Sequence, residues 1–141
     1  MRLLKYVFSI FVLFSVVGFA YAEGKDAPEA IEGTTRISAE DLIDLVDELD
    51  DLVLIDSRIP KDRTGGHIEG SVSLPDTETT IEALAKAIAT KDTPVIFYCN
   101  GVKCGRSVKA SKMAAAEGYS KVYWFRGGWE EWTNKGFPIS K

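Results

Sequence analysis

The amino-acid sequence predicts an α/β domain in which a mostly parallel central sheet carries helices on both faces. Three short apolar runs lack the polar alternation of half-exposed strands and are typical of strands buried on both sides: residues 52–55, 95–98 and 122–125. Segments with apolar residues at helical spacing lie between them. Alternating strands and helices favour right-handed crossovers, which make neighbouring strands parallel.

The first 22 residues are expected to be a secretory signal peptide. Arg2 and Lys5 precede an uncharged apolar stretch over residues 6–19, and Ala20 and Ala22 provide the small residues that a signal peptidase reads. The apolar stretch is short for a membrane span, which needs about 20 residues. An uncleaved anchor is the alternative. We therefore expect a periplasmic or otherwise exported protein, without stable membrane anchoring once the signal is cleaved.

Composition limits the partners and cofactors of the remaining chain. Cleavage after Ala22 leaves 119 residues, which suits one domain with one hydrophobic core. The cleaved segment holds two basic and no acidic residues, so the net charge changes from −4 to −6. A mildly acidic chain without a Lys/Arg run is not expected to bind nucleic acid. Two cysteines and one histidine are too few for a Cys/His zinc site, and no cofactor is expected.

The domain is expected to span residues 34–141, after a polar linker over residues 23–33 that contains Pro28. Residues 34–37 are expected to form a short first strand. Ser38, with an acidic residue three positions later, is typical of a helix start. The apolar residues that follow recur at the spacing of one helix face: Leu42, Leu45, Val46 and Leu49.

The middle of the chain is expected to alternate between loops and helices. The polar residues 59–66 are predicted to be a loop, and residues 71–74 a short extended piece. A helix is predicted over residues 80–89. Its apolar face is formed by Ile81, Leu84, Ala85 and Ile88. Near the end, two glycines turn the chain before a last short helix over residues 129–135.

The loop that follows residues 95–98 carries the candidate catalytic residue, Cys99. Function in such sheets sits at the carboxyl ends of the strands, and Cys99 occupies one of these ends. A helix that begins at Arg106 or Ser107 and ends at Gly118 directs its first amides toward the same place. A thiol in that field has a lowered pKa and is more reactive. An ordinary buried cysteine is the alternative.

The other loop residues are expected to bind a small anion. The loop contains two glycines, which adopt backbone angles that other residues resist, and two basic side chains. Curled loops of this kind point several N–H groups at one spot. The predicted binding residues are Asn100, Gly101, Val102, Lys103, Cys104, Gly105 and Arg106.

Four motifs in the same order resemble the rhodanese family. Residues 54–58, Leu-Ile-Asp-Ser-Arg, resemble the family's strand followed by Asp-x-Arg. Residues 66–75 resemble its Gly-His-Ile motif, and residues 97–99 resemble the strand that delivers the catalytic cysteine. Residues 122–132, with Gly-Gly-Trp inside them, resemble the closing motif. The resemblance covers roughly residues 34–138.

The resemblance implies the rhodanese fold and a thiosulfate-type sulfurtransferase. Cys99 would attack the outer sulfur of a donor such as thiosulfate and become a persulfide. An acceptor such as cyanide or another thiol would then remove the outer sulfur. The loop N–H groups would hold the developing negative charge. The implied partners are a small sulfur-containing anion and a thiol or protein sulfur acceptor. Asp56, Arg58 and His67 match motif positions with structural roles.

The loop departs from the family in its length and in its second cysteine. Six residues separate Cys99 from Arg106, more than in the family's sulfurtransferases or in phosphatases of this fold. Cys104 is a candidate resolving thiol that attacks a persulfide or forms a disulfide with Cys99; alternatively, it only packs. Two other functions stay open. One is a dithiol/disulfide redox protein using both cysteines, and the other is a persulfide carrier for a protein partner.

Overall fold

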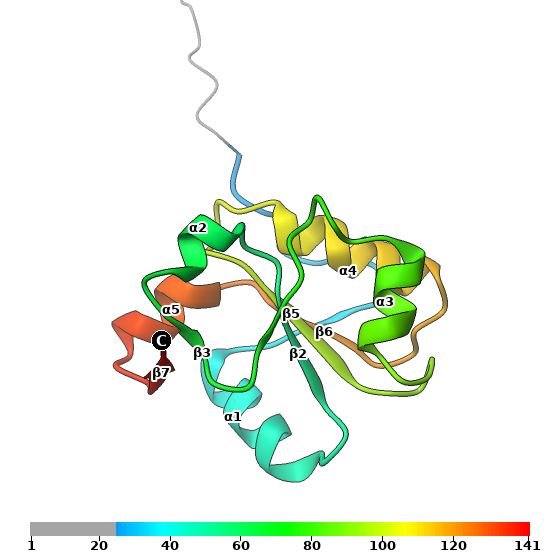
Figure 1. Ribbon diagram of the computed structural model, residues 1–141, viewed down its shortest axis with the longest axis horizontal. Coiled ribbons are helices and arrows are strands. Elements are labelled where there is room, and N and C mark those ends of the chain that lie inside the picture. Colours follow the sequence, from blue (N-terminus) through cyan, green and yellow to red (C-terminus); the bar gives the residue numbers. More distant parts are fainter. Residues whose placement is uncertain (1–24) are drawn as a thin grey trace, which may run out of the picture.

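The computed structural model describes residues 25–141 and confirms the predicted α/β architecture (Figure 1). The predicted signal peptide lies outside the described residues. Within residues 25–141, no helix has the length and apolarity needed to cross a membrane. The elements follow in this order: β1 (Thr35–Arg36), α1 (Ala39–Glu48), β2 (Val53–Asp56), α2 (Pro60–Arg63), β3 (His67–Ile68), β4 (Val72–Ser73), α3 (Ile81–Ala87), β5 (Val95–Tyr98), α4 (Arg106–Ala116), β6 (Val122–Phe125), α5 (Gly128–Asn134) and β7 (Ile139–Ser140).

The central sheet has five strands in the order β1-β6-β5-β2-β4, and every neighbouring pair is parallel. The chain leaves β2 toward β4 on one side and returns to β5 on the other side of β2. The direction in which successive strands are added to the sheet therefore reverses between β2 and β5. The carboxyl ends of these two strands are followed by Ser57 and Cys99. In parallel sheets this is the place where binding sites form.

Helices cover both faces of the sheet, and alternate residues of β5 contact the two layers. Ile96 and Tyr98 join a core cluster with residues of α1 and α5. Val95 and Phe97 join a second cluster with residues of α3 and α4. All four side chains are buried, which explains why this strand is an unbroken apolar run in the sequence.

The start of α1 has the predicted capping chemistry. Asp41 donates its backbone N–H to Ser38 Oγ at 3.1 Å, and the Asp41 carboxylate accepts the Ser38 N–H at 2.8 Å, which completes a capping box. On α3, Leu84 and Ile88 are buried as predicted, but Ile81 is 50% exposed. This helix contacts the core through a narrow stripe rather than through the whole predicted face.

Three short elements were not predicted from the sequence: α2, β3 and β7. Residues 59–66, predicted to be a loop, contain helix α2, which places Pro60 in its first turn, where a missing N–H has no cost. Four residues are too few for helical periodicity to show. The strand β3 pairs antiparallel with β7, near the end of the chain. Neither strand is long enough to have a pattern of its own.

Residues 25–33, expected to belong to a linker, pack against the domain and form what we call the N-terminal strap. Ala27 and Ile31 are buried in a cluster with Trp124. The Ala27 N–H donates to Val102 O at 2.6 Å, and Arg126 donates to Ala27 O at 2.8 Å. The linker prediction is thus wrong for these residues, because a few small apolar side chains anchor a segment that is otherwise polar.

Candidate active site

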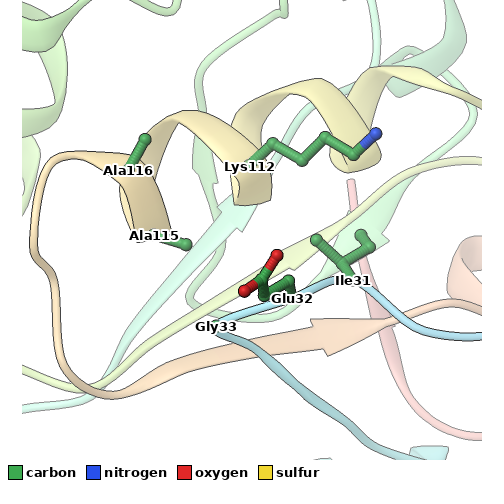
Figure 2. A pocket seen from close by; sticks show the side chains of 6 residues that line it. All are labelled: Ile31, Glu32, Gly33, Lys112, Ala115 and Ala116. Atoms are coloured by element: carbon green, nitrogen blue, oxygen red, sulfur yellow. The ribbon is translucent and has the colours of Figure 1, made fainter.

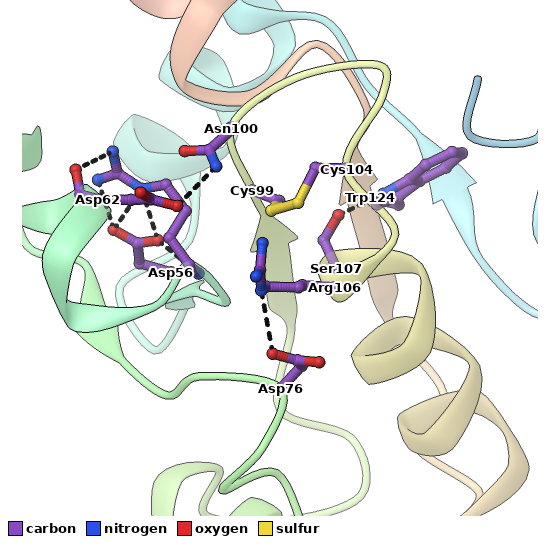
Figure 3. The surroundings of a disulfide bond; sticks show 10 residues. Asp56, Asp62, Asp76, Cys99, Asn100, Cys104, Arg106, Ser107 and Trp124 are labelled. Carbon is purple, nitrogen blue, oxygen red and sulfur yellow. Dashed lines mark hydrogen bonds and ion pairs between the residues drawn. A yellow bond between two sulfur atoms is a disulfide. The ribbon is translucent and has the colours of Figure 1, made fainter. Parts of the chain in front are cut away.

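Cys99 and Cys104 are joined by a disulfide bond at the carboxyl end of β5 (Figure 3). Their Cα atoms are 6.1 Å apart. Cys99 is only 1% exposed, whereas Cys104 is partly exposed. The structure therefore describes the oxidised protein, in which residues 25–141 contain no free thiol.

The loop residues predicted to bind an anion surround one pocket of about 480 Å³. Its lining consists of Asn100, Gly101, Val102, Lys103, Cys104, Gly105, Arg106 and Glu130. Cys99 is buried and does not line the pocket itself, but it is bonded to Cys104, which does. Glu130 comes from α5 and was not predicted, since nothing in its local sequence connects it to a loop some thirty positions earlier.

Backbone hydrogen bonds fix the shape of the loop. Cys104 donates its N–H to Gly101 O at 3.0 Å, which closes a tight turn. The first residues of α5 support the base of the loop, where the Trp129 N–H donates to Cys99 O at 2.8 Å and the Glu130 N–H donates to Asn100 O at 2.8 Å. The Asn100 side chain is held as well, because its Nδ2 donates to the carboxylate of Asp62 at 2.8 Å.

The N–H groups at the rim of the pocket are available to an anion. Those of Val102, Lys103 and Gly105 have no acceptor within residues 25–141. They sit directly before α4, whose N-terminal end adds a partial positive charge. Arg106 Nε lies 3.2 Å from Asp76 Oδ1, so its charge is shared with a carboxylate. The backbone amides and the exposed Lys103 are therefore the main electropositive groups of the pocket.

Gly128 gives the loop its close contact with α5. Its φ is +54°, a conformation that favours glycine. A Cβ at this position would overlap the carbonyl oxygen of Cys99 and lie 3.0 Å from its carbonyl carbon and 3.2 Å from the amide nitrogen of Gly101. No other residue fits here without moving the backbone that carries the cysteine.

A buried network of charged and polar side chains is centred on Asp56, at the end of β2. The Asp56 carboxylate accepts hydrogen bonds from Arg58, from Arg63 Nη1 at 2.8 Å and from the Tyr98 hydroxyl at 2.8 Å. Asp56 and Arg58 are both fully buried. The Arg58 guanidinium also donates to Gly66 O at 2.9 Å and lies 4.6 Å from the centre of the Trp129 ring. The network thus ties β2 and β5 to the start of α5.

The pKa values of this network follow from burial and charge. Burial raises the pKa of Asp56, but the hydrogen bonds and the positive charge of Arg58 outweigh it and leave the pKa below its usual range. Burial, together with the charge of Asp56, raises the pKa of Tyr98 to about 12. Asp56 therefore stays ionised and Tyr98 stays protonated near neutral pH, which preserves their hydrogen bond.

The lowered pKa of Asp56 makes the stability of the fold sensitive to acid. A carboxyl whose pKa is depressed by folding contributes stability above its unfolded pKa of about 3.9, and this contribution is lost as the pH falls through the folded value. We expect the free energy of unfolding to fall from about pH 4.5 downward, and to fall less steeply in Asp56→Asn. Urea unfolding of both proteins at a series of pH values measures this difference; parallel profiles would contradict it.

His67 belongs to this network rather than to the cysteine loop. Its Nδ1 lies 3.0 Å from Ile68 O and 3.3 Å from Ser71 Oγ, and Ser71 in turn contacts the Tyr98 hydroxyl. This is the packed position predicted for a motif residue. Within residues 25–141, no group of three or more His, Cys, Asp or Glu side chains is arranged to hold a metal.

A second pocket, of about 450 Å³, lies between the N-terminal strap and α4 (Figure 2). Its charged lining residues are Glu32 and Lys112, and the rest of the lining is small or apolar. It contains neither cysteine, so the cysteine loop is the better candidate for thiol chemistry.

Comparison with known proteins identifies the family of this chain. The family profile described as "Rhodanese-like domain" matches residues 38–135. A sulfurtransferase from Allochromatium vinosum is 29% identical over 104 residues, which cover 74% of this chain and 92% of that protein. The thiosulfate sulfurtransferase GlpE from Tolumonas auensis is 33% identical over 98 residues, or 70% of this chain and 87% of that protein.

A solved structure gives the same result for the fold. The solution structure of a polysulfide-sulfur transferase homodimer from Wolinella succinogenes has a TM-score of 0.64 and 25% identity, covering 77% of this chain and 79% of that chain. The family match runs from the N-cap of α1 to the end of α5 and includes the whole cysteine loop. The chain therefore belongs to the rhodanese-like domain family and is related to its sulfurtransferases.

Proposed function

We propose that the protein moves sulfane sulfur from a donor anion such as thiosulfate to a thiophilic acceptor, through a persulfide on Cys99. The observation that carries this proposal is the position of Cys99. It follows the central strand β5 and is bonded to Cys104, which lines a pocket that also contains backbone N–H groups without an acceptor in the described residues. The names of the relatives support a sulfur anion as substrate, with polysulfide as a second donor of the same class.

The chemistry needs the reduced protein. The Cys99 thiolate attacks the outer sulfur of thiosulfate; the sulfur–sulfur bond of the donor breaks, and sulfite leaves with the electron pair. The loop N–H groups and the N-terminal end of α4 stabilise the negative charge on the outer sulfur of the persulfide. A thiol or cyanide then attacks that outer sulfur and restores the Cys99 thiolate. This two-step cycle predicts ping-pong kinetics.

The test uses a variant that cannot form the disulfide. Reduced Cys104→Ser protein is expected to gain one sulfur atom, about 32 Da, on incubation with thiosulfate, because the first half-reaction needs only Cys99. The matched variant Cys99→Ser is expected to gain nothing. Intact mass spectrometry under non-reducing conditions measures both. An unchanged mass for Cys104→Ser would disprove the proposed function.

A dithiol/disulfide redox function is the second candidate, and the observed Cys99–Cys104 bond favours it. It would leave the Cys104→Ser variant without a sulfur adduct. A persulfide carrier for a protein partner would show the adduct but turn over cyanide poorly. Steady-state thiocyanate formation therefore separates an enzyme from a carrier once the adduct is found.

We also propose that the protein acts outside the cytoplasm. The proposal is supported by the signal-peptide pattern of residues 1–22, because exported proteins meet an oxidising environment in which such a disulfide persists. The mature chain would then begin at Glu23. The intact mass of the protein recovered from the exported fraction tests this start.

A further inference from the structure

We propose that Cys104 is a resolving thiol that attacks the Cys99 persulfide, releases hydrosulfide and leaves the protein as the observed disulfide. The inference rests on the first step of the proposed function, formation of the Cys99 persulfide, and gives that persulfide a second route of discharge besides transfer to an acceptor. The sulfur of the donor would leave as hydrosulfide, and the protein would depend on a dithiol reductant to start the next cycle.

The geometry for this attack does not depend on the disulfide itself. The turn that brings Cys104 back toward Cys99 is closed by the hydrogen bond from the Cys104 N–H to Gly101 O. The base of the same loop is anchored through Trp129 and Glu130, and Val102 is held by the strap. Reduction removes one covalent bond and leaves these contacts, so the two sulfurs remain close. Such intramolecular thiols react with very high effective concentrations.

Burial decides which nucleophile reaches which sulfur. In the persulfide, the inner sulfur is Cys99 Sγ, which belongs to a side chain that is 1% exposed. An acceptor from solvent meets the outer sulfur in the pocket. Cys104 lines that pocket and already bonds to Cys99 Sγ in the observed structure. It is therefore the nucleophile placed to attack the inner sulfur.

The step balances without any outside oxidant. The Cys104 thiolate forms a bond to Cys99 Sγ, the bond between the inner and outer sulfurs breaks, and the outer sulfur leaves as hydrosulfide with the electron pair. Over both half-reactions, thiosulfate and two thiols become sulfite, hydrogen sulfide and one disulfide. The sulfane sulfur gains two electrons, and the two cysteine sulfurs lose one each.

The exposed end of the disulfide sets the entry point for the reductant. Cys104 is partly exposed and Cys99 is not, so an incoming thiolate attacks the Cys104 sulfur. The leaving group is then the Cys99 thiolate, which the free loop amides and the N-terminal end of α4 stabilise. A second thiol on the same reductant completes the exchange. The partner is accordingly a dithiol, small or protein-borne.

The experiment is a single turnover of reduced, reductant-free protein with thiosulfate under anaerobic conditions. Wild type is expected to release one sulfite and one sulfide per chain and to lose about 2 Da, the mass of the two thiol hydrogens. Cys104→Ser is expected to release one sulfite but no sulfide, and to gain about 32 Da. The same wild-type protein without thiosulfate keeps both thiols and serves as the control for stray oxidation.

The outcomes separate the two proposals. Wild type that retains the sulfur adduct and releases no sulfide would overturn the resolving role while leaving the proposed sulfur transfer intact. An adduct that moves to Cys104, located by peptide mapping, would also overturn it, because attack would then have fallen on the outer sulfur. A Cys104→Ser protein that forms no adduct would instead remove the proposed function on which the inference rests.

Discussion

Replacing Asp56 with asparagine is expected to lower the free energy of unfolding by about 3–5 kcal/mol, the usual cost of breaking a buried ion pair by removing one partner. Arg58 would stay buried with its charge uncompensated, because both residues are fully inaccessible to solvent. Arg63 and Tyr98 would lose the same charged acceptor. Urea unfolding at neutral pH, followed by the fluorescence of the buried Trp124, measures the change.

The matched control is Asp44→Asn, which makes the same chemical change on the exposed side of α1. We expect it to alter the unfolding free energy by less than about 0.5 kcal/mol. If Asp56→Asn cost as little as this control, the network would contribute nothing beyond its packing. That result would contradict a structural role for the Asp-x-Arg motif.

Replacing Gly128 with alanine is expected to damage both stability and chemistry. The added Cβ would overlap the Cys99 carbonyl oxygen, and the residue would be held at φ +54°. Relief requires the loop and α5 to separate, which breaks the hydrogen bond from Trp129 to Cys99. We expect a loss of about 2–4 kcal/mol in stability. Because misplacement of a reacting group by about 1 Å costs ~100-fold in rate, persulfide formation should fall by at least that factor.

Gly136→Ala is the control for the backbone conformation alone. Gly136 also has a positive φ, +71°, but a Cβ there would meet no atom within 4 Å. We expect it to cost about 1–2 kcal/mol through strain and to leave persulfide formation unchanged. Equal effects of the two substitutions on the rate of persulfide formation, measured by stopped incubation and mass spectrometry, would show that the close contact with Cys99 does not matter.

The sequence predicts those elements of the fold in which burial requires every residue to be apolar. The strands β5 and β6 are found at their predicted residues because both faces are covered, so every position had to be apolar. The strap, α2 and the β3–β7 pair were missed for the opposite reason. They are short and show no repeating pattern. The strap is held by the distant residues Trp124 and Arg126, and β3 by its pairing with β7.

The same distinction applies to the candidate site. Its loop is one continuous segment, so the residues from Asn100 to Arg106 were recognisable together once Cys99 was placed at a strand end. The groups that modulate the loop come from elsewhere in the chain: Asp62 on α2, Asp76 before α3 and Glu130 on α5. The disulfide was an open alternative, because five positions of separation permit a bond but do not orient the two sulfurs.

The N-terminal strap has a consequence for the order in which the protein acquires its site. Arg126 and Ala27 are 99 positions apart in the chain, yet their hydrogen bond helps to hold the segment that supports Val102. Contacts between such distant residues have the largest entropic cost of loop closure, so we expect them to form late in folding. The cysteine loop thus gains this support only when the first and last parts of the domain have met, which links the final arrangement of the loop to completion of the fold.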